Sequence, residues 1–448
     1  MSDYFNLRSL KQGRLLEQNL RDQIQLHDRL QELEDGSVEA EKLQEQLTKL
    51  QRQKLEYLQH PFQPINIQGA DNSIELGQTE NGEPYRIPLD QLTKHSLTVG
   101  ETGAGKTNLN YLILQQLNQQ GIPFWVFDVD PEYHSLLADD RFEDVLVIPW
   151  RHLKINPLYP PEGIRPSRWI QEFADLFGES QALISSRNLV YRVLSDCYSA
   201  QRMNPDPQKV PDLEILEQQI REYSPRDHVE RGYRSRVRDR LETINEATGP
   251  LFDCRRGIPI RELVNRNVVF QFDGLLDDAQ RLVMETLLYK LHLYRHQQPV
   301  TSQLRHVTII DEAYDMFPEE KEDNKKGQPR INVILKRTRK RGNGILAADQ
   351  EATKLMESLK ANTATKILLP STDEQQFESM SRSIGLDTEQ KEWCRNQLET
   401  GTALVYNRAT GLAPVDIPLV KPSEGEEVNI PAEMGGEWSE LKKSVVSD

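Results

Sequence analysis

The chain has 448 residues, enough for one large domain with attachments or for two or three smaller domains. Hydrophobic residues make up 37% and charged residues 28%, which is typical of a globular protein, and no apolar run reaches the roughly 18 residues of a transmembrane helix. The first residues, Met1–Tyr4, do not resemble a secretory signal. The three cysteines, Cys197, Cys254 and Cys394, suit a reducing cytosol rather than a disulfide framework or a zinc site, so we expect a cytoplasmic protein.

The net charge of −15 counts against a protein that coats DNA with its whole surface, because such proteins are usually basic. Contact with DNA would have to be restricted to a patch, such as the lining of a pore. The charge does not argue against a ring through which DNA is threaded.

Residues 1–60 predict a helical arm, because Glu, Gln, Leu, Lys and Arg dominate and no proline interrupts the segment before its end. Apolar residues recur in three groups: Leu16, Leu20 and Ile24 at four-residue spacing, and Leu26, Leu30 and Leu33, like Leu43, Leu47 and Leu50, at spacings of four and three residues. Asp35–Ser37 breaks the pattern, with Ser37 as an N-cap. The arm is therefore a helical hairpin or two short coiled-coil segments, which pack on their own domain, form oligomers or bind a partner.

Residues 61–95 predict a small β element, in which Asn81–Gly82 forms the turn between Ile74–Gly77 and Tyr85–Pro88. From residue 96 to 420, short apolar strands alternate with amphipathic helices, which indicates a mostly parallel sheet buried on both faces and an α/β fold. The predicted strands are Ser96–Val99, Phe124–Asp128, Val145–Ile148, Val268–Phe272, Val307–Ile310, Ile345–Ala348 and Lys366–Leu369.

Two further segments complete the predicted domain. A mostly helical insertion occupies about 165–265, and a β pair, Thr402–Tyr406 and Pro414–Val420, ends the domain. The acidic tail, 421–448, is expected to be mobile or to pack across a neighbouring subunit.

A complete G-x-x-x-x-G-K-[ST] motif follows the strand that ends at Val99 and precedes a helix, which is the arrangement of a phosphate-binding loop. Glycines let backbone N–H groups face the phosphates, and the helix N-terminus adds further donors. We expect Lys106 to reach the β- and γ-phosphates and the hydroxyl of Thr107 to bind Mg²⁺. The predicted nucleotide-binding residues are Gly100, Glu101, Thr102, Gly103, Ala104, Gly105, Lys106, Thr107 and Asn108.

An apolar strand ends in two carboxylates, Asp311 and Glu312. At the carboxyl end of a parallel strand beside the phosphate loop, Asp311 is placed to hold Mg²⁺ and Glu312 to act as general base on the attacking water. Adjacent acids of this kind are typical of P-loop ATPases with an extra strand between the lysine loop and the acidic strand. No Asn-Lys-x-Asp motif specifies guanine, so ATP is the expected nucleotide.

Another buried strand ends at Gln350, where a sensor of the γ-phosphate would lie. Just before this strand, residues 336–341 contain five cations. They form a solvated helix end, a contact to DNA phosphates, or an arginine finger that reaches the ATP of a neighbouring subunit.

Taken in order, these residues resemble the HerA family of bacterial and archaeal DNA-pumping ATPases, the ATPases of conjugative type IV secretion and, more distantly, FtsK. The resemblance covers roughly Ile74 to Val420. The segments that carry it are the lysine loop, Phe127–Tyr133, Ile155–Leu158 and the run from Ile309 to Gln350.

The resemblance implies a RecA-like fold, a homohexameric ring with ATP at subunit interfaces, double-stranded DNA in the centre, and a nuclease or another effector as partner. It assigns Arg339 as the arginine that acts in trans and Gln350 as the sensor. Pro131 stands where the family often has glycine. A helical arm also replaces the N-terminal β-barrel that usually docks the nuclease, so the nuclease is the part of the resemblance that this chain supports least.

The residues therefore leave three functions open. The first is an ATP-driven translocase on double-stranded DNA. The second is an effector-activating or scaffolding ATPase ring, for example in antiphage defence. The third is a motor of conjugation or secretion.

Overall fold

The computed structural model describes residues 21–26, 29–30, 39–40, 42–49, 61–62, 72–142, 144–198, 209–323 and 329–421. Within the predicted arm, the described pieces between 21 and 49 are helical. The rest of the arm and the tail after residue 421 lie outside the described residues. The coiled coil and the role of the tail therefore stay predictions.

The described strands form one sheet of eleven, in the order β2-β1-β11-β10-β9-β3-β8-β7-β4-β6-β5. Neighbours from β9 to β5 run parallel, and neighbours from β9 to β2 run antiparallel. The strands are β1 (Ser73–Thr79), β2 (Pro84–Pro88), β3 (Ser96–Val99), β4 (Phe124–Asp128), β5 (Val145–Pro149), β6 (Asn267–Gln271), β7 (Thr301–Ile310), β8 (Arg341–Asp349), β9 (Thr365–Leu368), β10 (Thr402–Asn407) and β11 (Gly411–Asp416).

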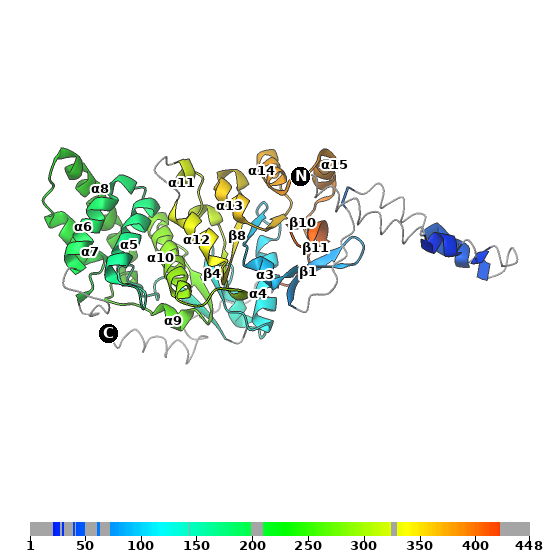
Figure 1. Cartoon of the computed structure of the whole chain (residues 1–448), viewed down its shortest axis with the longest axis horizontal. Coiled ribbons are helices and arrows are strands. Elements are labelled where there is room, and N and C mark those ends of the chain that lie inside the picture. The colour runs from blue at the N-terminus through cyan, green and yellow to red at the C-terminus, as the bar shows by residue number, and fades with distance from the viewer. Residues whose placement is uncertain are drawn as a thin grey trace.

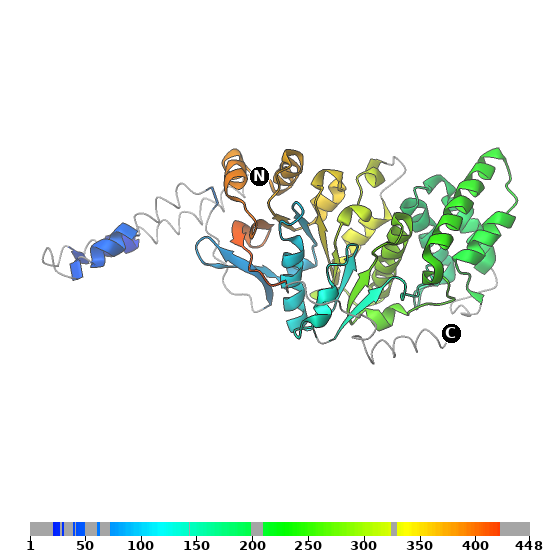
Figure 2. The same ribbon diagram turned by 180° about the vertical axis from the view of Figure 1, so that it is seen from behind.

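Helices cover both faces of the parallel part of the sheet. Crossovers between parallel strands are right-handed, so connections that travel in opposite directions along the sheet lie on opposite faces. The helix α4 connects β3 to β4 in one direction, and α10 and α12 lie on connections that run back (Figures 1 and 2). All residues of β3 and β4 are buried as a result, which explains their continuous apolar sequence.

The predicted helical insertion is present at the β5 end of the molecule, where α5 to α8 gather (Figure 1). The helices are α3 (Leu89–Leu92), α4 (Lys106–Gln119), α5 (Pro166–Ser180), α6 (Arg187–Tyr198), α7 (Leu213–Glu222), α8 (His228–Thr248), α9 (Ile260–Leu263), α10 (Asp277–His296), α11 (Glu320–Asp323), α12 (Arg330–Thr338), α13 (Glu357–Asn362), α14 (Glu374–Ile384) and α15 (Thr388–Gln397). No helix in the described part of the chain is long and apolar enough to span a membrane.

The strands β7 and β8 both begin earlier than predicted, because their first halves are polar and only their second halves carry the apolar signal. The predicted strand Pro414–Val420 is wrong at its end, since β11 stops at Asp416. Pro418 has no N–H group to donate to a strand ladder. Its carbonyl and the N–H group of Val420 bond instead to the side chain of Asn108.

The small β element is continuous with the main sheet. The strand β1 pairs antiparallel with β11, and β2 pairs with β1 at the sheet edge. The side chain of Gln116 in α4 also bonds the N–H and carbonyl groups of Glu75 in β1. The helix that follows the phosphate loop is therefore tied to the antiparallel part of the sheet.

The central strand β7 allows a direct test of the buried sheet. Ile309 has no exposed surface there. Ile309→Ala is expected to lower the free energy of unfolding by about 2–5 kcal/mol, because it leaves a cavity, and Ile309→Val by only about 0.5–1.5 kcal/mol. Denaturant or thermal unfolding of the two variants measures this difference. Equal, small losses in both would contradict burial of β7 between two helical layers.

Candidate nucleotide-binding site

The loop between β3 and α4 depends on its glycines for physical reasons. Gly103 and Gly105 have φ angles of 80° and 104°, where residues with a Cβ atom are strained. A Cβ atom on Gly100 would lie 2.6 Å from the Cβ atom of Leu369, just after β9. The motif is therefore required by the close approach of two strands as well as by the turn itself.

Lys106, the first residue of α4, is buried under this loop. Its Nζ atom donates to the carbonyl of Gly100 at 2.9 Å and to that of Glu101 at 3.2 Å. The ammonium group is thus held inside the loop by carbonyl oxygens, at the place where phosphate oxygens would compete for it.

A second contact fixes the loop from the other side. The carboxylate of Glu101 accepts hydrogen bonds from the N–H and hydroxyl groups of Thr372, which lies between β9 and α14. These bonds lower the pKa of Glu101. Glu101 therefore holds the loop in place through its side chain and faces the connection after β9.

Four carboxylates lie at the carboxyl ends of three neighbouring strands. Asp128 ends β4, Asp349 ends β8, and Asp311 and Glu312 follow β7. Burial raises the pKa of Asp128 to about 8, of Asp311 to about 6 and of Glu312 to about 7, and it also raises the pKa of Asp349. This edge of the sheet is acidic and poorly solvated, as a site for a cation needs.

Glu312 is connected to the tip of the phosphate loop through Gln350. The Nε2 group of Gln350 donates to Glu312 at 3.1 Å, and its Oε1 atom accepts from the hydroxyl of Thr102 at 2.7 Å. Glu312 also has a φ angle of 58°, an uncommon conformation for a residue with a Cβ atom. The predicted base and the predicted sensor therefore form one connected group beside the loop.

Tyr133 holds the other predicted acid. Its hydroxyl donates to Asp311 at 2.9 Å and accepts from Asn110 of α4 at 2.8 Å. Asp128 in turn accepts from the backbone N–H groups of Glu132 and Tyr133 and from the side chain of Gln271. The segment after β4 is thus folded around Asp128 and presents its side chains to the site.

The same segment also supplies Glu132, whose carboxylate accepts a hydrogen bond from the hydroxyl group of Thr107. The motifs alone assigned no task to Glu132, Tyr133 or Asp349. The signal that could have located the first two is Asp128, an acid at the end of a buried strand with Glu and Tyr close behind it. Asp349 caps the turn after β7 by accepting from the N–H group of Tyr314 at 2.6 Å.

Thr107, Asp311 and Glu132 offer hydroxyl and carboxylate oxygens, the donor set that Mg²⁺ prefers. No group of three His, Cys, Asp or Glu side chains within the described ranges could hold a metal by itself. Magnesium in phosphate-handling sites is usually bound by one or two protein groups together with phosphates and water. The residues therefore fit Mg²⁺ that is carried by a nucleotide.

Arg339 lies away from this group. It follows the last residue of α12 and precedes β8, whereas Gln350 follows the far end of β8. A strand of that length, nine residues, spans roughly 30 Å. The structure thus brings Lys106, Glu312 and Gln350 together at the carboxyl ends of the parallel strands, and it leaves Arg339 at the amino-terminal end of β8.

Residues 74–291 match the family model described as "Helicase HerA, central domain". Among curated proteins, the chain is 22% identical over 377 residues to the DNA double-strand break repair helicase HerA of Sulfolobus acidocaldarius, covering 81% of this chain and 71% of that protein. Both comparisons agree with the resemblance that the motifs indicate.

Solved structures show the same fold. VirB4 of Thermoanaerobacter pseudethanolicus aligns with a TM-score of 0.58 at 17% identity over 82% of this chain and 99% of that one. The bacterial conjugative coupling protein TrwB lacking its N-terminal segment aligns with a TM-score of 0.56 at 14% identity, over 82% and 91%. TrwB in complex with the ATP analogue ADPNP aligns with a TM-score of 0.57 at 16% identity, over 84% and 94%.

The contact between Tyr133 and Asp311 predicts that the hydroxyl contributes to turnover. Tyr133→Phe is expected to lower the rate of ATP hydrolysis by on the order of tenfold, the loss typical of a hydrogen bond to a charged group, with little change in fold. Tyr85→Phe is the matched control, because Tyr85 is also fully buried and hydrogen-bonded but lies in β2. Equal rates in the two variants would contradict a role for Tyr133 in the site.

Proposed function

We propose that this chain, which is of the HerA type with similarity to conjugative ATPases, hydrolyses ATP in a ring of identical subunits and thereby moves along double-stranded DNA. The observation that carries the proposal is the connected group of Thr102, Gln350 and Glu312 beside Lys106. It contains the parts that hydrolysis of a γ-phosphate requires: a cation, a base and a polar group that joins the base to the loop.

Each residue has a definite task in this proposal. Phosphate oxygens replace the carbonyls of the loop as partners of Lys106. The nucleotide brings Mg²⁺, which would be held by Thr107 and Asp311 and would neutralise phosphate charge. Glu312 accepts a proton from the attacking water, and its bond to Gln350 keeps the carboxylate oriented. Loss of the γ-phosphate alters the contacts of Gln350, and this change passes to the segment after β8.

Burial of Glu312 supports its role as a base. Its raised pKa of about 7 makes it a better proton acceptor than a solvated carboxylate. Glu312→Gln is therefore expected to bind ATP with near-normal affinity and to lose turnover by at least about 100-fold, the usual scale of general-base catalysis. Equilibrium binding of labelled ATP and phosphate release measure the two effects.

Glu319→Gln serves as the control for this variant, because Glu319 is an exposed acid on the same connection after β7. It should keep wild-type turnover. A fully active Glu312→Gln protein would assign the base to another residue.

The ring is supported by the position of Arg339. This exposed residue lies about the length of β8 away from its own site, so any nucleotide that it contacts would belong to another subunit. We propose that subunits form a homohexamer in which Arg339 stabilises the transition state in trans. A solvated helix end and a DNA contact, the two alternative roles of the basic run, predict different results on mutation.

Mixing experiments separate these three roles. Arg339→Ala and Lys106→Ala should each be inactive alone, and mixed rings should regain part of the activity, because an intact site of one variant then faces Arg339 of the other. Arg337→Ala, which removes a neighbouring exposed cation, should stay active. If mixing restores nothing, Arg339 does not act in trans. If both arginine variants lose only stimulation by DNA, the run is a DNA contact.

DNA as the substrate is supported by the HerA match and by the names of the relatives, a repair helicase and a conjugative coupling protein. We propose that a nuclease or another effector works with the ring in the cytoplasm. The test is the ATPase rate of the purified oligomer, sized by light scattering, with and without long double-stranded DNA. Strong stimulation of a hexamer is expected.

Two alternatives correspond to different outcomes of this test. A hexamer whose activity is indifferent to DNA would be an effector-activating or scaffolding ring, as in antiphage defence. A chain that turns over only together with a membrane complex would be a conjugation or secretion motor. The similarity to VirB4 and TrwB is the observation that keeps the second alternative open.

A further inference from the structure

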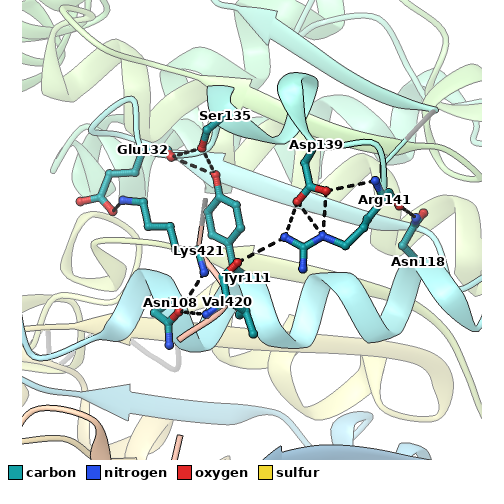
Figure 3. A network of polar contacts seen from close by, with 9 residues as sticks. All are labelled: Asn108, Tyr111, Asn118, Glu132, Ser135, Asp139, Arg141, Val420 and Lys421. Atoms are coloured by element: carbon teal, nitrogen blue, oxygen red, sulfur yellow. Dashed lines mark hydrogen bonds and ion pairs between the residues drawn. The ribbon is translucent and has the colours of Figure 1, made fainter. Parts of the chain in front are cut away.

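Residues 417–421, which we call the strap, follow β11, and Val420 and Lys421 lie against α4 at Asn108 (Figure 3). Asn108, the residue after Thr107, holds the strap with both ends of its amide. Its Nδ2 group donates to the carbonyl of Pro418 at 2.9 Å, and its Oδ1 atom accepts from the N–H groups of Val420 at 2.8 Å and Lys421 at 3.0 Å. The strap is therefore fixed to the first turn of α4.

Arg141 holds the strap from a second side. Its guanidinium donates to the carbonyl of Val420 at 3.2 Å and makes two-pronged contacts with Asp139 (Figure 3). These contacts lower the pKa of Asp139. Asn118 of α4 bonds the carbonyl of Arg141 at 2.6 Å, so the arginine is itself held against the helix. Side chains of Asn108 and Arg141 thus fix the backbone of the strap as far as Lys421.

The side chain of Lys421 turns toward the nucleotide site. Its ammonium group lies 3.3 Å from the Oε2 atom of Glu132. The same oxygen accepts a hydrogen bond from the hydroxyl group of Thr107. One carboxylate oxygen thus joins the terminal cation of the strap to the hydroxyl that is expected to bind Mg²⁺.

A metal ion on Thr107 would be a neighbour of both Glu132 and Lys421. Two cations that share one carboxylate repel each other, and the divalent ion is the stronger competitor at short range. The side chains of Lys421 and Glu132 are 25% and 42% exposed, so their mutual attraction is modest and can be displaced.

We propose that the ammonium group of Lys421 takes the place of Mg²⁺ as the cation beside Glu132. It balances Glu132 while the site is free of nucleotide, and it leaves Glu132 when Mg²⁺ arrives with the nucleotide. The strap then loses its end contact and loosens from α4. The state of the nucleotide site is in this way transmitted to the segment that follows β11. This inference rests on the proposed function, since it requires that Mg²⁺ and a nucleotide bind at this loop.

The first experiment measures binding rather than turnover. Lys421→Met is expected to tighten binding of Mg²⁺ with a fluorescent ATP analogue by about two- to fivefold, the range set by a partly exposed ion pair. Binding of the same analogue in EDTA should not tighten. Lys421→Arg keeps the cation and should bind like the wild type.

Lys391→Met is the matched control for the loss of one positive charge. Lys391 makes a partly exposed ion pair of the same kind with Glu378, at 2.7 Å, between α15 and α14. This variant should leave nucleotide affinity unchanged. An equal effect of both lysine variants would reduce the result to net charge and overturn the proposal.

The second readout is hydrogen exchange at the strap, whose Val420 and Lys421 N–H groups are both bonded to Asn108. Addition of Mg²⁺ with the ATP analogue to the wild-type protein should speed their exchange, whereas the analogue in EDTA should not. Lys421→Met should exchange fast under all conditions.

Three other outcomes would contradict the proposal or the function on which it rests. If Lys421→Met weakens binding of the magnesium complex, Lys421 is a phosphate ligand and the proposal is wrong. If affinity and exchange are unchanged, the ion pair is only structural and the proposal is equally wrong. If the wild-type protein binds no nucleotide at all, the proposed function fails. This result differs from the two above, in which nucleotide binds but Lys421 does not compete with Mg²⁺.

Discussion

The structure depends on keeping several buried carboxylates together where the strands β4, β7 and β8 end. Burial and, after it, neighbouring acids raise the pKa of these groups at this edge, and each is held by donors that the fold supplies. Asp128 is held by backbone N–H groups, Asp311 by Tyr133, and Glu312 by Gln350. A parallel sheet is what makes this possible, because it collects strand ends from distant parts of the chain at one edge. We propose that the acidity that remains attracts the Mg²⁺ that a nucleotide would bring.

The same edge also explains why the two sides of the phosphate loop differ. On one side, Thr102 is joined through Gln350 to Glu312, the proposed base, where a γ-phosphate would be attacked. On the other, Thr107 is joined to Glu132 and from there to the strap. In our proposal, chemistry and signalling are thus separated across a single short loop. The helix α4 connects them, because it begins with Lys106 and carries both the strap and a bond to Tyr133.

Local sequence was sufficient for the parts of the fold whose signal is local. Apolar runs located β3 and β4, and the lysine motif located the loop, because turn geometry and burial select residue types position by position. Local sequence was insufficient where the partners are distant in the chain. The polar first half of β7 is recognisable as strand only through its partner β8, and the end of β11 was misjudged because Asn108, 312 positions before Val420, captures the backbone of the strap. For the same reason no acid could be paired with Thr107 from the motifs, although Glu132 lies in a segment that carries the family resemblance.

The most direct test of the nucleotide site is a structure determined with Mg²⁺ and a non-hydrolysable ATP analogue. We predict that the Nζ atom of Lys106 leaves the carbonyls of Gly100 and Glu101 for the phosphates. We also predict that Thr107 contacts the metal, and that Glu312, still bonded to Gln350, faces the γ-phosphate. A nucleotide bound elsewhere, or a Lys106 that keeps its carbonyl partners beside an occupied loop, would contradict this assignment of the site.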